Sequence, residues 1–239
     1  QAHGALYKGR MVGTFGDIAA FSTMSGKHHA TGPQGGVVFT RDEALVWESK
    51  RFSDRGKPFN TEATSNLRAG LNLNGNDLSA AIGRVQLRRI VAMNDRRHQV
   101  AAQIEEGIAG LKAVRLGWQA EQTQGVYWFM RFHVDVDKLT VDKDTFAKAV
   151  AAEGVPVSAS YRFIPSEAIW FKERKVFPGS DYPWGLPAYQ GDRNAAFPCP
   201  NAVQSVERHC IMSIHENWSA QEVADVVAAL AKVEAAYLR

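Results

Sequence analysis

The sequence is poor in cysteine and contains no long apolar run. Cys199 and Cys210 are its two cysteines, and they do not form a C-x-x-C pair. A disulfide framework is therefore not expected at this length, and the reduced thiols of a cytoplasmic protein are the default. The longest apolar runs are too short for a transmembrane helix, so no membrane partner is expected. No signal peptide is visible, although the chain opens on Gln1 rather than Met, which indicates that residues precede it.

Blocks of like charge are absent too. The chain carries 28 Lys and Arg against 25 Asp and Glu, a net charge of +3, which favours neither nucleic acid nor an anionic membrane as a partner. Arg88, Arg89, Arg96 and Arg97 fall on helix-like sequence, where we predict a solvated helix face. What remains is an ordinary globular composition, with 45% hydrophobic residues, and enough chain for one large or two small domains.

Short strands are predicted on both sides of one lysine, Lys27. Residues 17–22 (DIAAFS) and 36–40 (GVVFT) are rich in apolar and β-branched residues and are bounded by glycines. Thr40 is then predicted to open a helix, with Glu43 as its capping-box partner. The segment that contains Lys27 is therefore expected to be a loop between two strands.

The middle of the chain is predicted to be mainly helical. Polar residues 53–72 are typical of a loop, and a long helix is predicted from about Asn76, where apolar residues recur at helical spacing. A second helical stretch follows a joint at residues 94–98. We place the domain boundary at this joint, which gives domains at residues 1–95 and 96–239.

The last part of the chain mixes strands and helices. Residues 126–134 (VYWFMRFHV) are predicted as one buried strand, and short strands are predicted at residues 155–159 and 211–214. Asp142 is expected to cap a helix, and Ser219 is expected to begin the last helix in a capping box with Glu222. Aromatic and proline-rich residues 163–200 show no periodicity. The pattern is therefore α/β in the first third of the chain and α+β afterwards.

Lys27 could be a surface charge, a phosphate ligand or a nucleophile. A Walker A loop is rejected, because a histidine follows the lysine and Phe21 stands at the required glycine position. A zinc site on His3, His28 and His29 is not expected either, because adjacent histidines on an irregular backbone point in different directions. We therefore predict no metal, while a surface lysine stays open from this segment alone.

The surroundings of Lys27 favour a cofactor. Ser22 ends the first strand, where a hydroxyl and backbone N–H groups can hold a phosphate. Four glycines leave room for a flat ligand: Gly26, Gly32, Gly35 and Gly36. Burial of a lysine disfavours its ammonium form and makes the amine a nucleophile for an aldehyde. A phosphate anchor followed by such a lysine suits pyridoxal phosphate.

Three segments carry a resemblance to a known family. They are QAHGALYKGRMVGTFGDIAAFSTMSGKHHATGPQGGVVFT at residues 1–40, GLNLNGNDLSAAIGRVQLRRI at residues 70–90 and, more loosely, SIHENWSAQEVADVVAAL at residues 213–230. They resemble the DegT/DnrJ/EryC1/StrS family of pyridoxal-phosphate aminotransferases. The resemblance implies an α/β fold of the aspartate-aminotransferase type (fold type I), in which the remainder of a large cofactor domain precedes a small α+β C-terminal domain.

The resemblance also implies roles for single residues. Lys27 matches the lysine that bonds the cofactor aldehyde and then moves a proton between substrate and cofactor carbons. Ser22 matches the phosphate-binding serine, and Gln1 matches a polar residue near the phenolic oxygen of the cofactor ring. Asn72 matches an asparagine that reaches the cofactor phosphate of the neighbouring subunit. A homodimer with shared active sites is therefore implied.

The sequence departs from the family pattern at two places. Asn74 replaces an arginine and Gly75 its apolar neighbour, and the family turn T-G-E-G-G appears as TGPQGG. The aspartate that pairs with the pyridine nitrogen should lie just before Gln1. These 239 residues alone are therefore expected to be inactive, because that aspartate stabilises the cofactor as an electron sink.

Four more residues are candidates for the substrate pocket. His3, His28 and His215 could line it, and Tyr161 matches a family tyrosine near the substrate entrance. For each histidine a hydrogen-bonded structural role is the alternative, and for Tyr161 the alternative is a core or rim aromatic.

The resemblance implies transfer of an amino group from glutamate or glutamine to a keto-sugar, linked to a nucleotide, or to a keto-cyclitol. Such products feed surface-polysaccharide or antibiotic pathways. A sugar dehydratase of the same fold is one alternative, although in those relatives a histidine replaces the lysine. A non-catalytic regulatory or binding homologue is the other alternative, and the retained Lys27 and Ser22 argue against it.

Overall fold

The computed structural model describes residues 1–159 and 164–239, so the candidate Tyr161 lies outside the described residues. The chain forms two compact units. The first unit contains residues 1–103, 118–128 and 214–220, and the second contains residues 104–117, 129–213 and 221–239. The units are therefore not consecutive along the chain, and each is described by itself.

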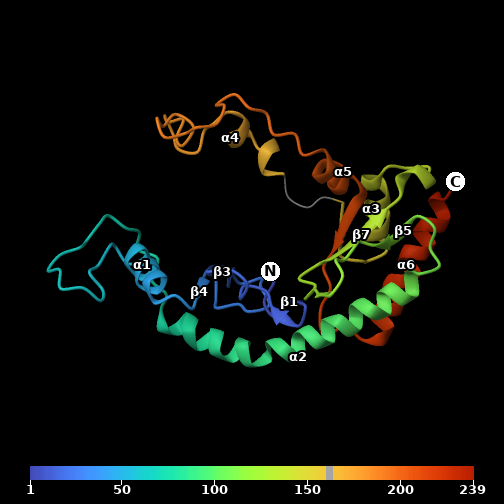
Figure 1. Cartoon of the computed structure of the whole chain (residues 1–239). Helices are drawn as coiled ribbons and strands as arrows, with labels where there is room; N and C mark the ends of the chain where they lie inside the picture. The colour runs from blue at the N-terminus through green and yellow to red at the C-terminus, as the bar shows by residue number, and fades with distance from the viewer. Residues whose placement is uncertain (160–163) are drawn as a thin grey trace. The chain divides into compact units, whose positions relative to one another are not determined.

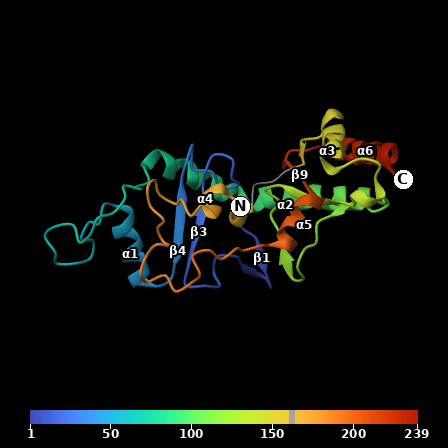
Figure 2. The ribbon, with the colours of Figure 1, turned by 90° about the horizontal axis from the view of Figure 1, so that it is seen from above.

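A pair of antiparallel strands flanks the lysine loop in the first unit. Strand β3 (Ile18–Ser22) pairs with β4 (Gly36–Thr40), with Ile18 opposite Thr40 and Ser22 opposite Gly36. Figure 2 shows the two strands side by side. Both predicted strands are confirmed to within one residue.

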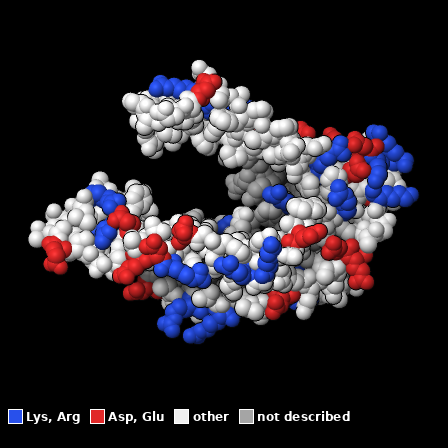
Figure 3. Space-filling model, viewed as in Figure 1, with Lys and Arg blue, Asp and Glu red and all other residues white. Residues whose placement is uncertain are grey.

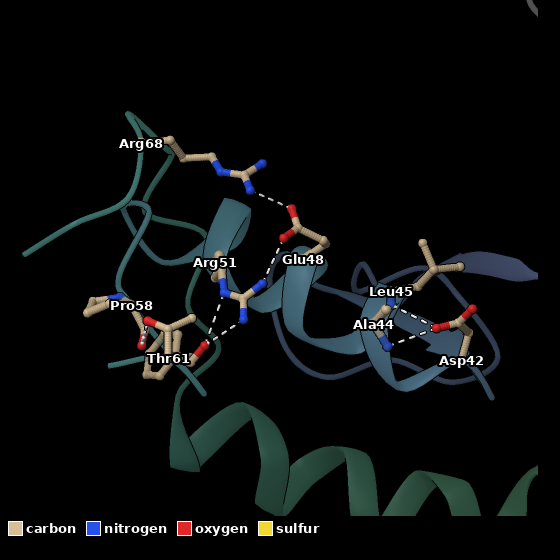
Figure 4. Close-up of polar contacts among 9 residues, drawn as sticks. Asp42, Ala44, Leu45, Glu48, Arg51, Pro58, Thr61 and Arg68 are labelled. Atoms are coloured by element: carbon tan, nitrogen blue, oxygen red, sulfur yellow. Dashed lines mark hydrogen bonds and ion pairs between the residues drawn. The ribbon is translucent and has the colours of Figure 1, made fainter. Parts of the chain in front are cut away.

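Helix α1 (Glu43–Ser53) follows β4, but the predicted N-cap is wrong. Asp42 is the cap, because its carboxylate accepts hydrogen bonds from the backbone N–H groups of Ala44 and Leu45 at 2.8 and 3.2 Å. Thr40 is still the last residue of β4, and its hydroxyl instead donates to the Asp17 carbonyl at 2.6 Å. Figure 4 shows the capping carboxylate at the first turn.

Helix α2 (Asp77–Ile108) is continuous through the predicted joint at residues 94–98. It appears in Figure 1 as the longest helix of the described chain. The prediction of two helical stretches is wrong, because the polar residues at the joint are buried on the helix rather than placed in a turn. Asn94 and Arg97 are 5% and 7% exposed, and both bond to distant backbone carbonyls.

A three-stranded sheet brings the segment near residue 123 beside the first residues of the chain. Strand β1 (Leu6–Tyr7) is central and pairs in antiparallel fashion with β2 (Arg10–Met11) and with β6 (Thr123–Gln124). This pairing holds residues 118–128 within the first unit.

The second unit is built on a four-stranded antiparallel sheet in the order β5-β7-β9-β8. Its strands are β5 (Val114–Leu116), β7 (Met130–Val134), β8 (Val157–Ser158) and β9 (His209–Met212). The strand predicted at residues 126–134 is therefore correct only in its second half. The first half belongs to the other unit, and β7 begins only at Met130.

Helices complete the second unit. They are α3 (Lys143–Ala152), α4 (Ile169–Lys172), α5 (Pro200–Arg208) and α6 (Ala220–Tyr237), with 3-10 turns at Val136–Lys138 and Pro165–Glu167. Asp142 caps α3 as predicted, by accepting from the Thr145 N–H at 2.7 Å. The core of this unit includes Phe132, Phe146, Met212 and Leu230, all 1% exposed or less.

One buried carboxylate in the second unit was not predicted. Glu234 of α6 is 4% exposed and accepts hydrogen bonds from the backbone N–H groups of Lys112, Ala113 and Val114 at 2.7–2.9 Å. The Glu234 side chain thus satisfies three backbone donors at the start of β5, which a hydrophobic residue at this buried position could not do.

The described surface carries charges of both signs. Figure 3 shows basic and acidic side chains mixed over the face in view. Among the described helices, none has both the length and the apolar character that crossing a membrane requires.

Candidate active site

The loop between β3 and β4 is closed by its own threonines. The Thr23 N–H donates to the Gly35 carbonyl at 2.9 Å, and the Thr31 N–H donates to the Thr23 carbonyl at 2.9 Å. The two threonine hydroxyls hydrogen-bond each other at 2.6 Å, and Thr23 is 1% exposed. A Cβ on Gly35 would lie 2.4 and 2.6 Å from these hydroxyl oxygens, so only glycine fits there. These bonds fix the two ends of the loop that carries Lys27.

Lys27 is held against Trp128. Its ammonium lies 3.8 Å from the centre of the indole ring, within the range of a cation–π interaction. The indole N–H donates to the Gly26 carbonyl at 2.5 Å, and the Lys27 N–H donates to the Met24 carbonyl at 2.9 Å. The sequence placed Trp128 only in the buried strand predicted at residues 126–134. Its position about a hundred residues away in sequence left no local spacing that could link it to the lysine.

Arg97 fixes the segment that carries Trp128. Its Nη1 donates to the Tyr127 carbonyl at 2.9 Å and to the Ile214 carbonyl at 3.0 Å. Its Nε and Nη2 lie 2.9 and 2.8 Å from one carboxylate oxygen of Glu216. The prediction of a solvated helix face is therefore wrong for Arg97, a buried guanidinium in which all three nitrogens have partners.

The histidines near Lys27 are mostly buried. His3 and His28 are 7% and 3% exposed, and neither ring nitrogen of either residue has a hydrogen-bond partner among the described residues. Burial lowers the pKa of both imidazoles from 6.5 to about 4, and neighbouring positive charge, from Arg97 in the case of His28, adds to this effect. His29 instead bonds the Gly83 carbonyl of α2 through Nε2 at 3.0 Å, which fastens the lysine loop to the helix.

The first residues of the chain are also fastened to α2. The Asn94 amide donates to the His3 carbonyl at 2.9 Å. Gly4 follows with φ of 83°, and a Cβ there would lie 2.5 Å from the Asn94 nitrogen. Glycine is therefore required by both the backbone conformation and the close approach of the helix.

The other predicted site residues lie at several places in the first unit. Ser22 is exposed at the end of β3, beside the start of the lysine loop, and Gln1 is exposed at the first position. His215 is exposed, and its Nδ1 accepts from the Asn217 N–H at 3.1 Å. Asn72 is exposed on the loop before α2, where its side-chain oxygen accepts from the Asn74 amide at 2.8 Å. Their roles toward substrate and cofactor stay predictions.

The donor set fits a ligand that carries both a phosphate and an aldehyde. The exposed Ser22 hydroxyl and the Asn72 amide are donors of the kind that bind phosphate oxygens. Lys27 supplies the primary amine that an aldehyde requires. The residues present therefore fit pyridoxal phosphate.

Comparison with known proteins identifies the family that the sequence resembles. The DegT/DnrJ/EryC1/StrS aminotransferase family matches residues 1–231. A dTDP-3-amino-3,4,6-trideoxy-α-D-glucose transaminase of Streptomyces venezuelae is 33% identical over 53% of this chain and 33% of its own length. An L-glutamine:2-deoxy-scyllo-inosose aminotransferase of Micromonospora echinospora is 30% identical over 67% of this chain and 41% of its own length.

A solved structure agrees with this assignment. The aminotransferase from Psychrobacter cryohalolentis superposes with a TM-score of 0.80 and 25% identity, over 99% of this chain and 60% of its own. The chain thus spans less than two thirds of the length of each of these relatives. The fold of the pyridoxal-phosphate aminotransferases, predicted from the sequence, is confirmed. With a family match over residues 1–231, the chain belongs to the DegT/DnrJ/EryC1/StrS aminotransferase family.

Proposed function

We propose that the full-length protein transfers an amino group from glutamate or glutamine to a keto-sugar, linked to a nucleotide, or to a keto-cyclitol. The observation that carries the proposal is the amine of Lys27, held over Trp128 in the loop that leaves β3 at Ser22. The family uses pyridoxal phosphate, and the two curated relatives named above are enzymes of a sugar and of a cyclitol.

Lys27, Ser22 and Gln1 have distinct roles in the proposed reaction. When bound, pyridoxal phosphate supplies an aldehyde that takes up the amino group and a ring that draws electrons from the reacting carbon. Lys27 would hold the cofactor aldehyde through Nζ, and once free its amine would move a proton between the substrate and cofactor carbons. The Ser22 hydroxyl would bind a phosphate oxygen, and the Gln1 amide would serve the phenolic oxygen.

Trp128 serves the same step by keeping Lys27 in place. Its ring covers the ammonium, and its N–H fixes the Gly26 carbonyl beside the lysine. A lysine that is held near its working position loses less conformational freedom when it reacts. Trp128 is thus a positioning residue in this proposal.

The proposal extends to the assembly. Asn72 donates to the phosphate in a neighbouring subunit, so the working unit is a homodimer in the cytoplasm with sites shared across its interface. Residues 1–95 complete the large cofactor domain, and residues 96–239 form the small domain.

Half-reactions test the proposed function. The full-length protein loaded with pyridoxal phosphate is mixed with glutamate or with glutamine, without an acceptor, and its visible spectrum is followed. The proposal predicts that one donor converts the cofactor to its amine form and releases the matching keto acid, and that Lys27→Ala does neither. If neither amino acid changes the spectrum of the wild-type protein, the aminotransferase assignment is wrong.

A further inference from the structure

A small polar cluster lies where the loop carrying Asn72 returns to helix α1. Asp54 is the C-cap of α1 and is 6% exposed, and it forms an isolated antiparallel bridge with Asn72. The two chain segments are joined on both sides of this bridge. The Arg55 N–H donates to the Leu71 carbonyl at 2.8 Å, and the Leu73 N–H donates to the Ser53 carbonyl at 2.8 Å.

The loop is anchored further out as well. Arg51 of α1 donates to the Phe59 carbonyl through two nitrogens at 3.0 and 2.8 Å. Glu48 binds Arg68 at 2.6 Å, and Figure 4 shows these two side chains meeting. The two arms touch at Gly56, where a Cβ would lie 1.8 Å from the Arg68 carbonyl oxygen. The backbone at Asn72 is therefore set by contacts on both arms of the loop.

Side-chain hydrogen bonds in the cluster fix which way the Asn74 and Asn72 amides point. The Asn74 amide nitrogen lies 3.0 Å from Oδ1 of Asp54 and 2.8 Å from Oδ1 of Asn72. An ionised carboxylate only accepts, so Asp54 fixes the nitrogen end of the Asn74 amide toward itself. That nitrogen then binds the oxygen end of Asn72, which leaves the N–H₂ end of this exposed side chain to donate elsewhere.

Charge in the cluster agrees with this direction. Asp54 is bonded by Arg55 at 2.7 Å and by Lys57 at 3.0 Å, so two cations surround one carboxylate. The Asn74 hydrogen bond, together with those of Lys57 and Arg55, holds the pKa of Asp54 well below its usual range although burial opposes this. The carboxylate therefore stays an acceptor throughout the pH range in which the folded protein is handled.

We propose that Asp54 and Asn74 are positioning residues that orient the Asn72 amide as a donor to the cofactor phosphate. The inference rests on the proposed function, because Asn72 must be the group that meets the phosphate. It assigns a role to Asn74 at the position where the family pattern has an arginine. The excess of positive charge beside the cluster favours the same anion.

Binding of pyridoxamine 5′-phosphate to the cofactor-free full-length protein tests the inference, because this ligand has the phosphate but no aldehyde. Asn72→Ala and Asn74→Leu are each expected to weaken its binding roughly tenfold, the effect of losing a hydrogen bond to a charged group. Because Asn74 acts through Asn72, the double variant is expected to bind no more weakly than Asn72→Ala alone. Pyridoxamine without phosphate should bind all these variants like the wild type.

Two further variants separate positioning from loop stability. Asn66→Ala is the matched control, since Asn66 also donates one side-chain hydrogen bond in this loop, to the Arg55 carbonyl at 2.8 Å, and should leave binding unchanged. Asp54→Asn keeps the size of the side chain but can donate, so it is expected to weaken binding as Asn74→Leu does.

The outcomes distinguish a failure of the positioning roles of Asp54 and Asn74 from a failure of the proposed function. If Asn72→Ala weakens binding while Asn74→Leu and Asp54→Asn do not, the inference is overturned and the proposed function stands. Additive losses in the double variant, or an equal loss in Asn66→Ala, overturn it as well. If Asn72→Ala has no effect, the phosphate role of Asn72 in the proposed function fails, and the inference fails with it.

Discussion

Replacing Trp128 should free Lys27 without removing it. Trp128→Phe keeps an aromatic face but loses the hydrogen bond to the Gly26 carbonyl, which contributes about 1 kcal/mol. Trp128→Leu also loses the cation–π contact at 3.8 Å, about 0.5–1 kcal/mol for a partly exposed lysine. The held position should therefore become roughly fivefold less favoured in the first variant and about tenfold or more in the second.

Competitive labelling of amines measures this effect in the cofactor-free full-length protein. Acetic anhydride at limiting amounts followed by peptide mapping gives the reactivity of Lys27 relative to the exposed Lys8, which serves as the internal standard. Lys27 should react several-fold faster in Trp128→Phe and faster again in Trp128→Leu. Trp170→Leu is the matched control, because the Trp170 ring packs on Phe171 rather than on a lysine. Equal reactivity of Lys27 in all four proteins would refute the reasoning.

Two other predictions concern stability. His28 has a folded-state pKa of about 4 against 6.5 when unfolded, so its contribution to folding stability is complete above about pH 6.5 and is lost as the pH falls toward 4. Between pH 7 and pH 5, the melting temperature of His28→Phe should therefore fall less than that of the wild type. An equal fall in the two proteins would contradict this. Glu234→Ala leaves the N–H groups of Lys112, Ala113 and Val114 without their acceptor and should lower the free energy of unfolding by about 3 kcal/mol or more in urea titrations, whereas a loss below about 1 kcal/mol would show that water replaces the carboxylate.

Local sequence was sufficient for the lysine loop. Strands β3 and β4 were predicted almost to the residue, because runs of apolar and β-branched residues bounded by glycines specify short strands without help from the rest of the chain. The start of α2, predicted at about Asn76 and found at Asp77, was equally local. The family resemblance then supplied the candidate roles of Lys27 and Ser22, which spacing alone left open.

Long-range contacts explain what the sequence did not reveal. Arg97 and Asn94 look like solvent-facing residues on a helix, and only their partners at Glu216 and His3 show that they are buried. Trp128 belongs to an apolar run that periodicity assigns to a single strand, yet that run is divided between two compact units. Pairing across about a hundred residues leaves no mark in local spacing, so such contacts required the structure.

The identity of the modified lysine tests the account most directly. The full-length protein is loaded with pyridoxal phosphate, reduced with borohydride and digested, and the peptide that carries the cofactor is sequenced by mass spectrometry. The account predicts a single stable modification on Lys27 and its loss in Lys27→Ala. Modification of a different lysine, or none in a protein that has visibly taken up the cofactor, would contradict it.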